Sequence, residues 1–208
     1  MQHKITTGQV AQIDAALAKA GINYADIRME LTDHIATALE QEEGNGDFEH
    51  RLKGYILNNK KAIRKMNFAA MRVASRRSLR TFVQNIFTLH MLLITLVMLA
   101  GGKLASQYLD KDDLVTLMFF VFSTCTVISC YRPLYNLVRK RKDYSFTHGL
   151  GFIPGLLLYP SLFMIRWLNK LNNINYIILY YVVVSVIALN IYFTTKKLFD
   201  NYKLRYNG

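Results

Sequence analysis

Three residues with acid–base and metal-binding chemistry, Glu30, Asp33 and His34, lie within about one helical turn of one another. Glu30 and His34 are four residues apart, so on a helix both point to one face. Such a group could bind a metal ion or transfer protons. The alternative is that Glu30 holds His34 beside an apolar stripe, while Asp33 faces water or caps a neighbouring helix. Because residues 1–50 contain no second cluster of ligands, we interpret the group as structural or partner-binding.

A second set of polar side chains lies inside apolar stretches. His90 and Asn190 each interrupt a long apolar run, and Gln84 and Asn85 precede His90 by about one to two turns. Ionisable side chains are costly inside a membrane and usually face other protein. A proton relay or a pH sensor is one interpretation of His90. We favour a neutral histidine near the middle of its span, hydrogen-bonded between helices, with Asn190 at a comparable depth.

The sequence contains no recognisable catalytic site. Its two cysteines, Cys125 and Cys130, are five residues apart in an apolar run, so on a helix they point in different directions. We expect both to be small packing residues. No nucleophile, metal-binding or nucleotide-binding motif is found elsewhere. We therefore predict a protein without catalytic activity, metal or cofactor.

Charge is divided sharply along the chain. Residues 1–50 carry nine acidic and three basic residues, whereas residues 51–80 carry ten basic residues and no acid. Basic clusters beside a membrane segment attract anionic lipid headgroups. We expect these headgroups, and not nucleic acid, to be the partner of Arg72, Arg76, Arg77 and Arg80. An ordinary positively charged flank of a membrane helix explains the same residues more simply.

Four stretches are apolar enough for transmembrane helices, each of which needs about 20 mostly apolar residues. They are residues 82–102, 114–131, 149–167 and 176–195, and none contains an acidic residue. The sequence thus predicts an all-α fold with a four-helix transmembrane bundle within a membrane domain of residues 81–208. Glycines and prolines in the stretch 149–167 would kink a helix or make this segment re-entrant.

Lysine and arginine set the expected orientation, because they accumulate in cytoplasmic loops. The connection after residue 131 and the C-terminal tail are rich in them, whereas the other two connections hold two each. With four spans, both termini lie in the cytoplasm. A re-entrant third segment would move the tail to the other side, against this bias. Residues 1–20 are polar and amphipathic, so we expect no cleavable signal peptide.

Residues 1–50 are predicted to form a small cytosolic helical head. Thr6 and Gln9 match a capping box, and Gly21 stands where a C-terminal cap belongs. A second helix is expected from Asn23 as N-cap, with Asp26 in its first turn. Its apolar stripe comprises Ile27, Leu31, Ile35 and Leu39.

A third helix is expected from Asp47, with an apolar face that includes Leu52, Ile63 and Met66. No Pro or Gly occurs between Gly54 and Gly101, so this helix continues, unbroken or with one bend, through a basic stalk of residues 51–80 into the first span. Two short helices offer few large apolar side chains. The head therefore needs this third helix, a second copy of the chain or a protein partner.

The segment from Gly21 to Ile35, with Glu40 beyond it, resembles the pattern GI-x-Y-x-D-[LI]-x-x-E-L-x-D-H-I…E of small bacterial membrane proteins. Their heads are similar to the HAAS type of cytosolic helical domain, which is often found beside PadR-type transcription regulators. The match covers about residues 5–45. The resemblance implies a bacterial inner-membrane location and no particular chemistry.

We therefore expect a non-catalytic inner-membrane protein whose cytosolic head binds a protein partner in a regulatory or adaptor role. The alternative is a small transporter or channel-like protein, because four short spans match the size of small multidrug exporters. Those exporters rely on a membrane-embedded glutamate in their first helix. This chain has His90 and no acid in any predicted span, which disfavours the alternative.

Overall fold

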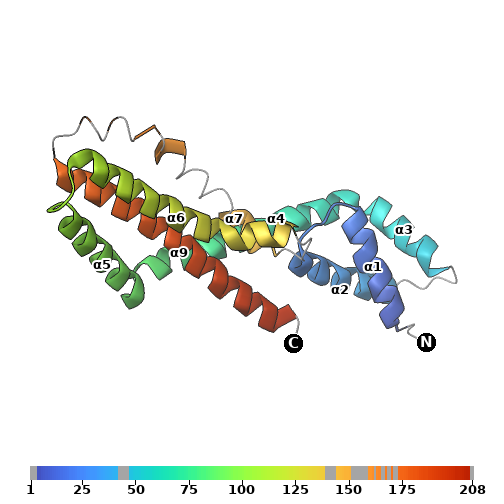
Figure 1. Ribbon diagram of the computed structural model, residues 1–208. Helices are drawn as coiled ribbons and strands as arrows, with labels where there is room; N and C mark the ends of the chain where they lie inside the picture. Colours follow the sequence, from blue (N-terminus) through green and yellow to red (C-terminus); the bar gives the residue numbers. More distant parts are fainter. Residues whose placement is uncertain are drawn as a thin grey trace.

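The computed structural model describes residues 4–41, 47–138, 144–150 and 173–206, together with 159–161, 163, 164, 167 and 170. Within this part of the chain every regular element is helical, which confirms the all-α prediction. Figure 1 shows an elongated molecule with a head at one end and long apolar helices at the other. The helices are α1 (Thr7–Lys19), α2 (Ala25–Gln41), α3 (Phe48–Asn58), α4 (Lys60–Ile86), α5 (Leu89–Ala105), α6 (Lys111–Val138), α7 (Phe146–Leu150) and α9 (Ile174–Tyr206).

The local signals at the start of the chain are confirmed. The Gln9 backbone N–H donates to the Thr6 hydroxyl at 3.4 Å, and the Thr6 N–H donates to the Gln9 side chain at 2.8 Å. Gly21 has a φ of 89°, the left-handed conformation that ends a helix at low cost for glycine. Helix α2 begins later than predicted. Tyr24, not Asn23, precedes its first residue and accepts the first helical hydrogen bond from the Arg28 N–H at 3.0 Å.

The head completes its core with residues of the predicted stalk. Buried side chains of α1, α2 and the connection between them pack with Leu52 of α3 and Ile63 of α4. The expected third helix bends at Asn59, where α3 ends and α4 begins. This break changes which face of α4 meets the head, and Met66, predicted to be buried, is 40% exposed. The head core comprises Ile13, Leu17, Ile22, Ile27, Leu31, Ile35, Leu39, Leu52 and Ile63.

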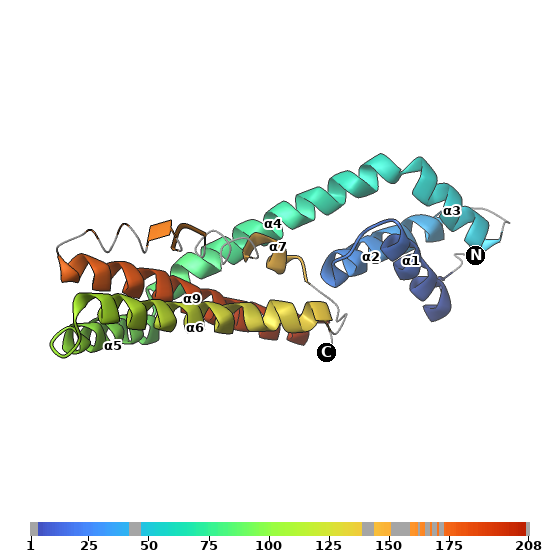
Figure 2. The same cartoon turned by 45° about the horizontal axis from the view of Figure 1, so that its top comes forward.

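A second core lies between α5, α6 and α9, which run side by side in Figures 1 and 2. Large apolar side chains of α6 and α9, among them Phe122, Ile177 and Val182, are fully buried. Gly102 lets α5 approach α9 closely, since a Cβ at this position would lie 2.8 Å from Ile178 Cγ2. Each of the three helices also exposes large apolar side chains, which is the pattern of a surface that faces lipid.

In the part of the chain that the structure describes, two helices are long and apolar enough to cross a membrane, over Lys111–Tyr131 in α6 and Ile174–Leu204 in α9. Within the described residues, α4 and α5 would supply a third crossing if they together form one span, and these two helices are bent by 57° at their junction. The predicted span 82–102 is therefore not one straight helix. The predicted span 149–167 lies largely outside the described residues, so a four-helix transmembrane bundle stays a prediction.

The break between α4 and α5 has a local cause despite the lack of Pro or Gly. Thr88 has extended backbone angles, φ −75° and ψ 150°, and precedes α5 as its N-cap residue. Its hydroxyl donates to the Asn85 carbonyl at 2.6 Å. A threonine side chain that bonds to the preceding turn in this way replaces a backbone hydrogen bond, so the helix can end here.

Candidate functional site

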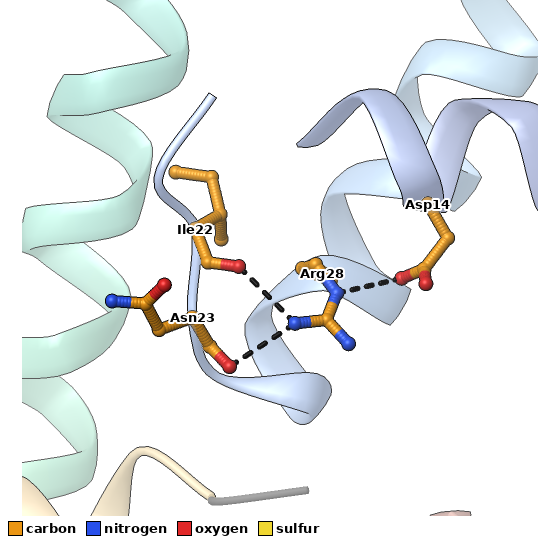
Figure 3. A network of polar contacts seen from close by, with 4 residues as sticks. All are labelled: Asp14, Ile22, Asn23 and Arg28. Carbon is orange, nitrogen blue, oxygen red and sulfur yellow. Dashed lines mark hydrogen bonds and ion pairs between the residues drawn. The ribbon is translucent and has the colours of Figure 1, made fainter. Parts of the chain in front are cut away.

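One arginine fastens the first two helices of the head together. Arg28 Nε donates to Asp14 Oδ1 of α1 at 2.8 Å, and its Nη1 donates to the carbonyl oxygens of Ile22 and Asn23 at 3.2 Å and 3.1 Å (Figure 3). The guanidinium group suits this task because its donors diverge in a fixed plane. Arg28 of α2 is thereby bonded both to α1 and to the turn that connects α1 with α2.

The three residues singled out from the sequence lie on the outer surface of α2. Glu30, Asp33 and His34 are all exposed, so none of them belongs to the buried stripe of α2. Met29, beside them, is also exposed. In the described ranges, no cluster of His, Cys, Asp or Glu has the arrangement of a metal site.

Asp26 makes a contact that the sequence does not reveal. It lies in the first turn of α2 and is only 4% exposed. The backbone N–H of Ser145 donates to Asp26 Oδ1 at 3.0 Å, and the Ser145 hydroxyl donates to Asp26 Oδ2. These two residues are 119 positions apart in the sequence. The carboxylate therefore joins the head to the segment that follows α6.

We call residues 144–150, which include α7, the strap. Its aromatic rings pack against the C-terminal turns of α9: the Tyr144 ring centroid lies 5.5 Å from that of Tyr202, and the Phe146 centroid lies 5.1 Å from it. The head contributes Ala25 to the same apolar cluster, which also contains Leu198. In Figure 2 the strap lies beside α4. The strap thus contacts α2, α4 and α9.

A polar junction lies inside the apolar part of the molecule, where α4 ends. Asn85 Nδ2 donates to Asn190 Oδ1 at 3.0 Å and lies 3.4 Å from the Thr194 hydroxyl. Asn190 Nδ2 donates to the Phe82 carbonyl at 2.9 Å. Asn85, Asn190 and Thr194 are all buried. These bonds satisfy polar groups that water cannot reach and fasten the end of α4 to α9.

His90 is close to this junction but takes no part in it. It lies in the first turn of α5, is exposed, and places its ring edge-on to Phe193 at a centroid distance of 5.5 Å. Its Nε2 is 3.4 Å from the Thr88 hydroxyl, two residues away. The interhelical hydrogen bond predicted for His90 is made by Asn85 instead. Asn190 is placed between helices, as the sequence suggested.

The basic residues of α4 form an outward-facing surface. Arg72, Arg76, Arg77 and Arg80 are all exposed. The four basic residues nearer the start of the helix are exposed as well, namely Lys60, Lys61, Arg64 and Lys65. The last turns of α4 after Arg80 carry no basic residue, and Val83 and Phe87 are exposed apolar residues at the end of this helix. The basic residues of α4 therefore end at Arg80, whereas exposed apolar residues lie both among them, as Phe68 and Val73, and beyond them.

No known protein family, curated protein or solved structure matches this chain. The resemblance of the α2 sequence to small bacterial membrane proteins stays a prediction.

Two contacts described above were missed by sequence reasoning. Asp26 was expected only as an acidic residue of a first helical turn, and Asn85 only as a polar neighbour of His90. A signal for Asn85 existed, because an amide within an apolar stretch needs a partner. No local signal connects Asp26 with Ser145, since their contact depends on how the head lies against the strap.

Proposed function

We propose that this chain is a non-catalytic, multi-pass protein of the bacterial inner membrane whose cytosolic head binds a protein partner. The face of α2 that carries Glu30, Asp33 and His34 supports this role, because it is exposed on a head whose own core is complete. Arg28 fastens α1 to α2, and Asp26 joins α2 to the strap. A partner on this face would thus be connected to the membrane helices.

We further propose that the membrane surface crosses α4 between Arg80 and Val83, with anionic lipid headgroups at the four arginines. The side-chain pattern supports this placement, since the last basic residue of α4 is Arg80 and exposed apolar residues follow it. Helix α9 agrees with it: Lys196 and Lys197 are exposed just beyond Thr194, which meets Asn85 of α4. Both the head and the end of α9 then lie on the cytoplasmic side, as the charge bias predicts.

The test is site-specific photocrosslinking of the full-length protein in native membranes. A crosslinker in place of Asp33 on α2 should capture one defined protein. The same crosslinker in place of Gln12, which is exposed on α1, should not capture it. Changing Glu30 and His34 to alanine should reduce the capture. The adaptor role is refuted if the Asp33 position yields no adduct, or the same adducts as the Gln12 position.

A small transporter is the second candidate, and one observation favours it. The Tyr181 hydroxyl and the Ser185 hydroxyl are buried in α9 and have no hydrogen-bond partner within the described part of the chain. Unpartnered polar groups are costly in an apolar bundle and can mark a path for polar solutes. Liposome flux should then be measurable for the wild type and reduced by Tyr181→Phe and His90→Ala. Flux that is absent from the wild type removes this candidate.

A further inference from the structure

The strap occupies the end of the proposed partner face. Asp26, Glu30 and Asp33 follow one another at steps of four and three residues, so they lie along one face of α2. Ser145 covers the first of them with two hydrogen bonds, while the other two are exposed. The beginning of this face is therefore already filled by a segment of the same chain.

We propose that the strap is an autoinhibitory segment: residues 144–146 close the beginning of the α2 face, and partner binding across the whole face requires their release. This inference rests on the proposed partner-binding role of the head. To that role the inference adds how the α2 face is regulated and which chemical group the face recognises. The recognised group is a serine hydroxyl and its backbone N–H, flanked by aromatic side chains.

The Asp26 contact has the properties of a releasable bond. A buried carboxylate loses its hydration, and here two hydrogen-bond donors from one residue compensate for that loss. The start of α2 also favours a negative charge, because the helix dipole is positive there. Among the described residues, Asp26 makes no ion pair. Water can replace both donors when Ser145 and Asp26 separate, so this polar contact costs less to open than the apolar cluster that holds Tyr144 and Phe146.

The strap also connects this contact to the membrane helices. Tyr144 packs edge-on against Phe199 at a centroid distance of 5.6 Å, and both Tyr144 and Phe146 contact Tyr202. Leu198 and Phe82 belong to the same cluster, so it is shared by α9 and the end of α4. A shift of α9 against α4 would remove the support of the aromatic rings. Release of the head can thus follow from a change among the membrane helices.

The first test measures amide hydrogen exchange at the beginning of α2 in the full-length protein in lipid nanodiscs. Ser145→Ala should raise the exchange rates of residues 25–31 about tenfold, because the hydroxyl hydrogen bond to the charged Asp26 is lost while the backbone N–H donor remains. Ser145→Thr, which keeps the hydroxyl, should stay within about threefold of the wild type. Thr147→Ala is the matched control, since this hydroxyl bonds only to the Tyr144 carbonyl. Equal exchange in the Ser145→Ala, Thr147→Ala and wild-type proteins overturns the proposal.

The second test adds a fluorescent peptide with the sequence of residues 144–150 to the same proteins. The peptide should bind Ser145→Ala protein about tenfold more tightly than wild type, because the competing segment is weakened. Adding Asp26→Ala should abolish the binding. Equal affinity for the wild type and Ser145→Ala, or no binding to Ser145→Ala, overturns autoinhibition by the strap. Both readouts are independent of the crosslinking from position 33, so failure of the partner role is seen separately.

Discussion

The side-chain amide of Asn85 donates to the side-chain oxygen of Asn190 at 3.0 Å, across 105 positions of sequence. Asn190 in turn donates to the Phe82 carbonyl at 2.9 Å, near the end of α4. The pair stands beside the point where the chain bends by 57° into α5. A helix that ends among apolar side chains must satisfy its free polar groups within the protein. This junction supplies such groups and fixes the place where α4 meets α9.

Removal of either asparagine should loosen the junction. Asn85→Ala and Asn190→Ala are each expected to destabilise the protein. The second should cost more, because the Asn190 side chain bonds to Asn85, the Phe82 carbonyl and Thr194, whereas Asn85 bonds only to Asn190 and Thr194 among the described residues. Hydrogen bonds between membrane helices contribute on average about 0.6 kcal/mol and at most about 1.7 kcal/mol in double-mutant cycles. We expect a coupling energy in this range for the pair, measured by unfolding in detergent. Strictly additive effects of the two substitutions would show that the side chains do not interact.

Substitution of Gly102 should separate α5 from α9. Gly102→Ala places a Cβ 2.8 Å from Ile178 Cγ2, and overpacking of this kind costs about 1–3 kcal/mol. Gly101→Ala is a close control, since its Cβ would meet nothing within 4 Å. That control should be neutral or slightly stabilising, because alanine favours a helix more than glycine does. Ile178→Leu, which has no methyl group on Cβ, should rescue Gly102→Ala. Thermal unfolding in detergent measures all three, and equal effects at positions 101 and 102 would refute the close approach.

Arg28 should contribute more to the stability of the head than its ion-pair partner Asp14 does. Asp14→Ala removes one bond to a carboxylate that is 42% exposed, so we expect a loss of at most about 1 kcal/mol. Arg28→Ala also removes the donors to the carbonyl oxygens of Ile22 and Asn23. We expect a larger loss, about 1–3 kcal/mol. Limited proteolysis of the α1–α2 turn in the full-length protein measures both. Equal susceptibility of the two variants would contradict the role of the carbonyl contacts.

The arginines near the membrane should determine lipid preference. Arg72, Arg76, Arg77 and Arg80 changed together to glutamine should reduce the retention of anionic lipid, because each basic side chain at the surface contributes about 1 kcal/mol.

The same helix supplies the control, in which Lys60, Lys61, Arg64 and Lys65 are changed to glutamine. The nearest of them, Lys65, lies 15 positions before Arg80, about 22 Å along the helix and beyond the screening length of roughly 8 Å from the proposed membrane surface. Their loss should leave lipid retention unchanged. Co-purified lipid is counted by mass spectrometry. An equal loss of anionic lipid in both quadruple variants would show that charge alone, and not position, matters.

The sequence predicted those features whose causes are local. The capping box of Thr6 and Gln9 and the cap at Gly21 involve residues close in the chain, so they are readable without a fold. The apolar stretches of α6 and α9 are likewise a property of composition over one helix. Exposure of the four arginines follows from the cost of burying charge.

Only the tertiary structure decided which polar residues meet. His90 and Asn85 stand in the same apolar stretch, and the rotation of α4 against α9 placed Asn85 beside Asn190 while leaving His90 exposed. The bend at Phe87 and Thr88 depends on the extended backbone of Thr88. The sequence does not predict this bend, because no Pro or Gly lies near it. Asp26 accepts hydrogen bonds from Ser145 because the head packs against the strap. Sequence alone determines the helices and their caps through neighbours along the chain, whereas contacts between distant side chains depend on packing angles that no local pattern contains.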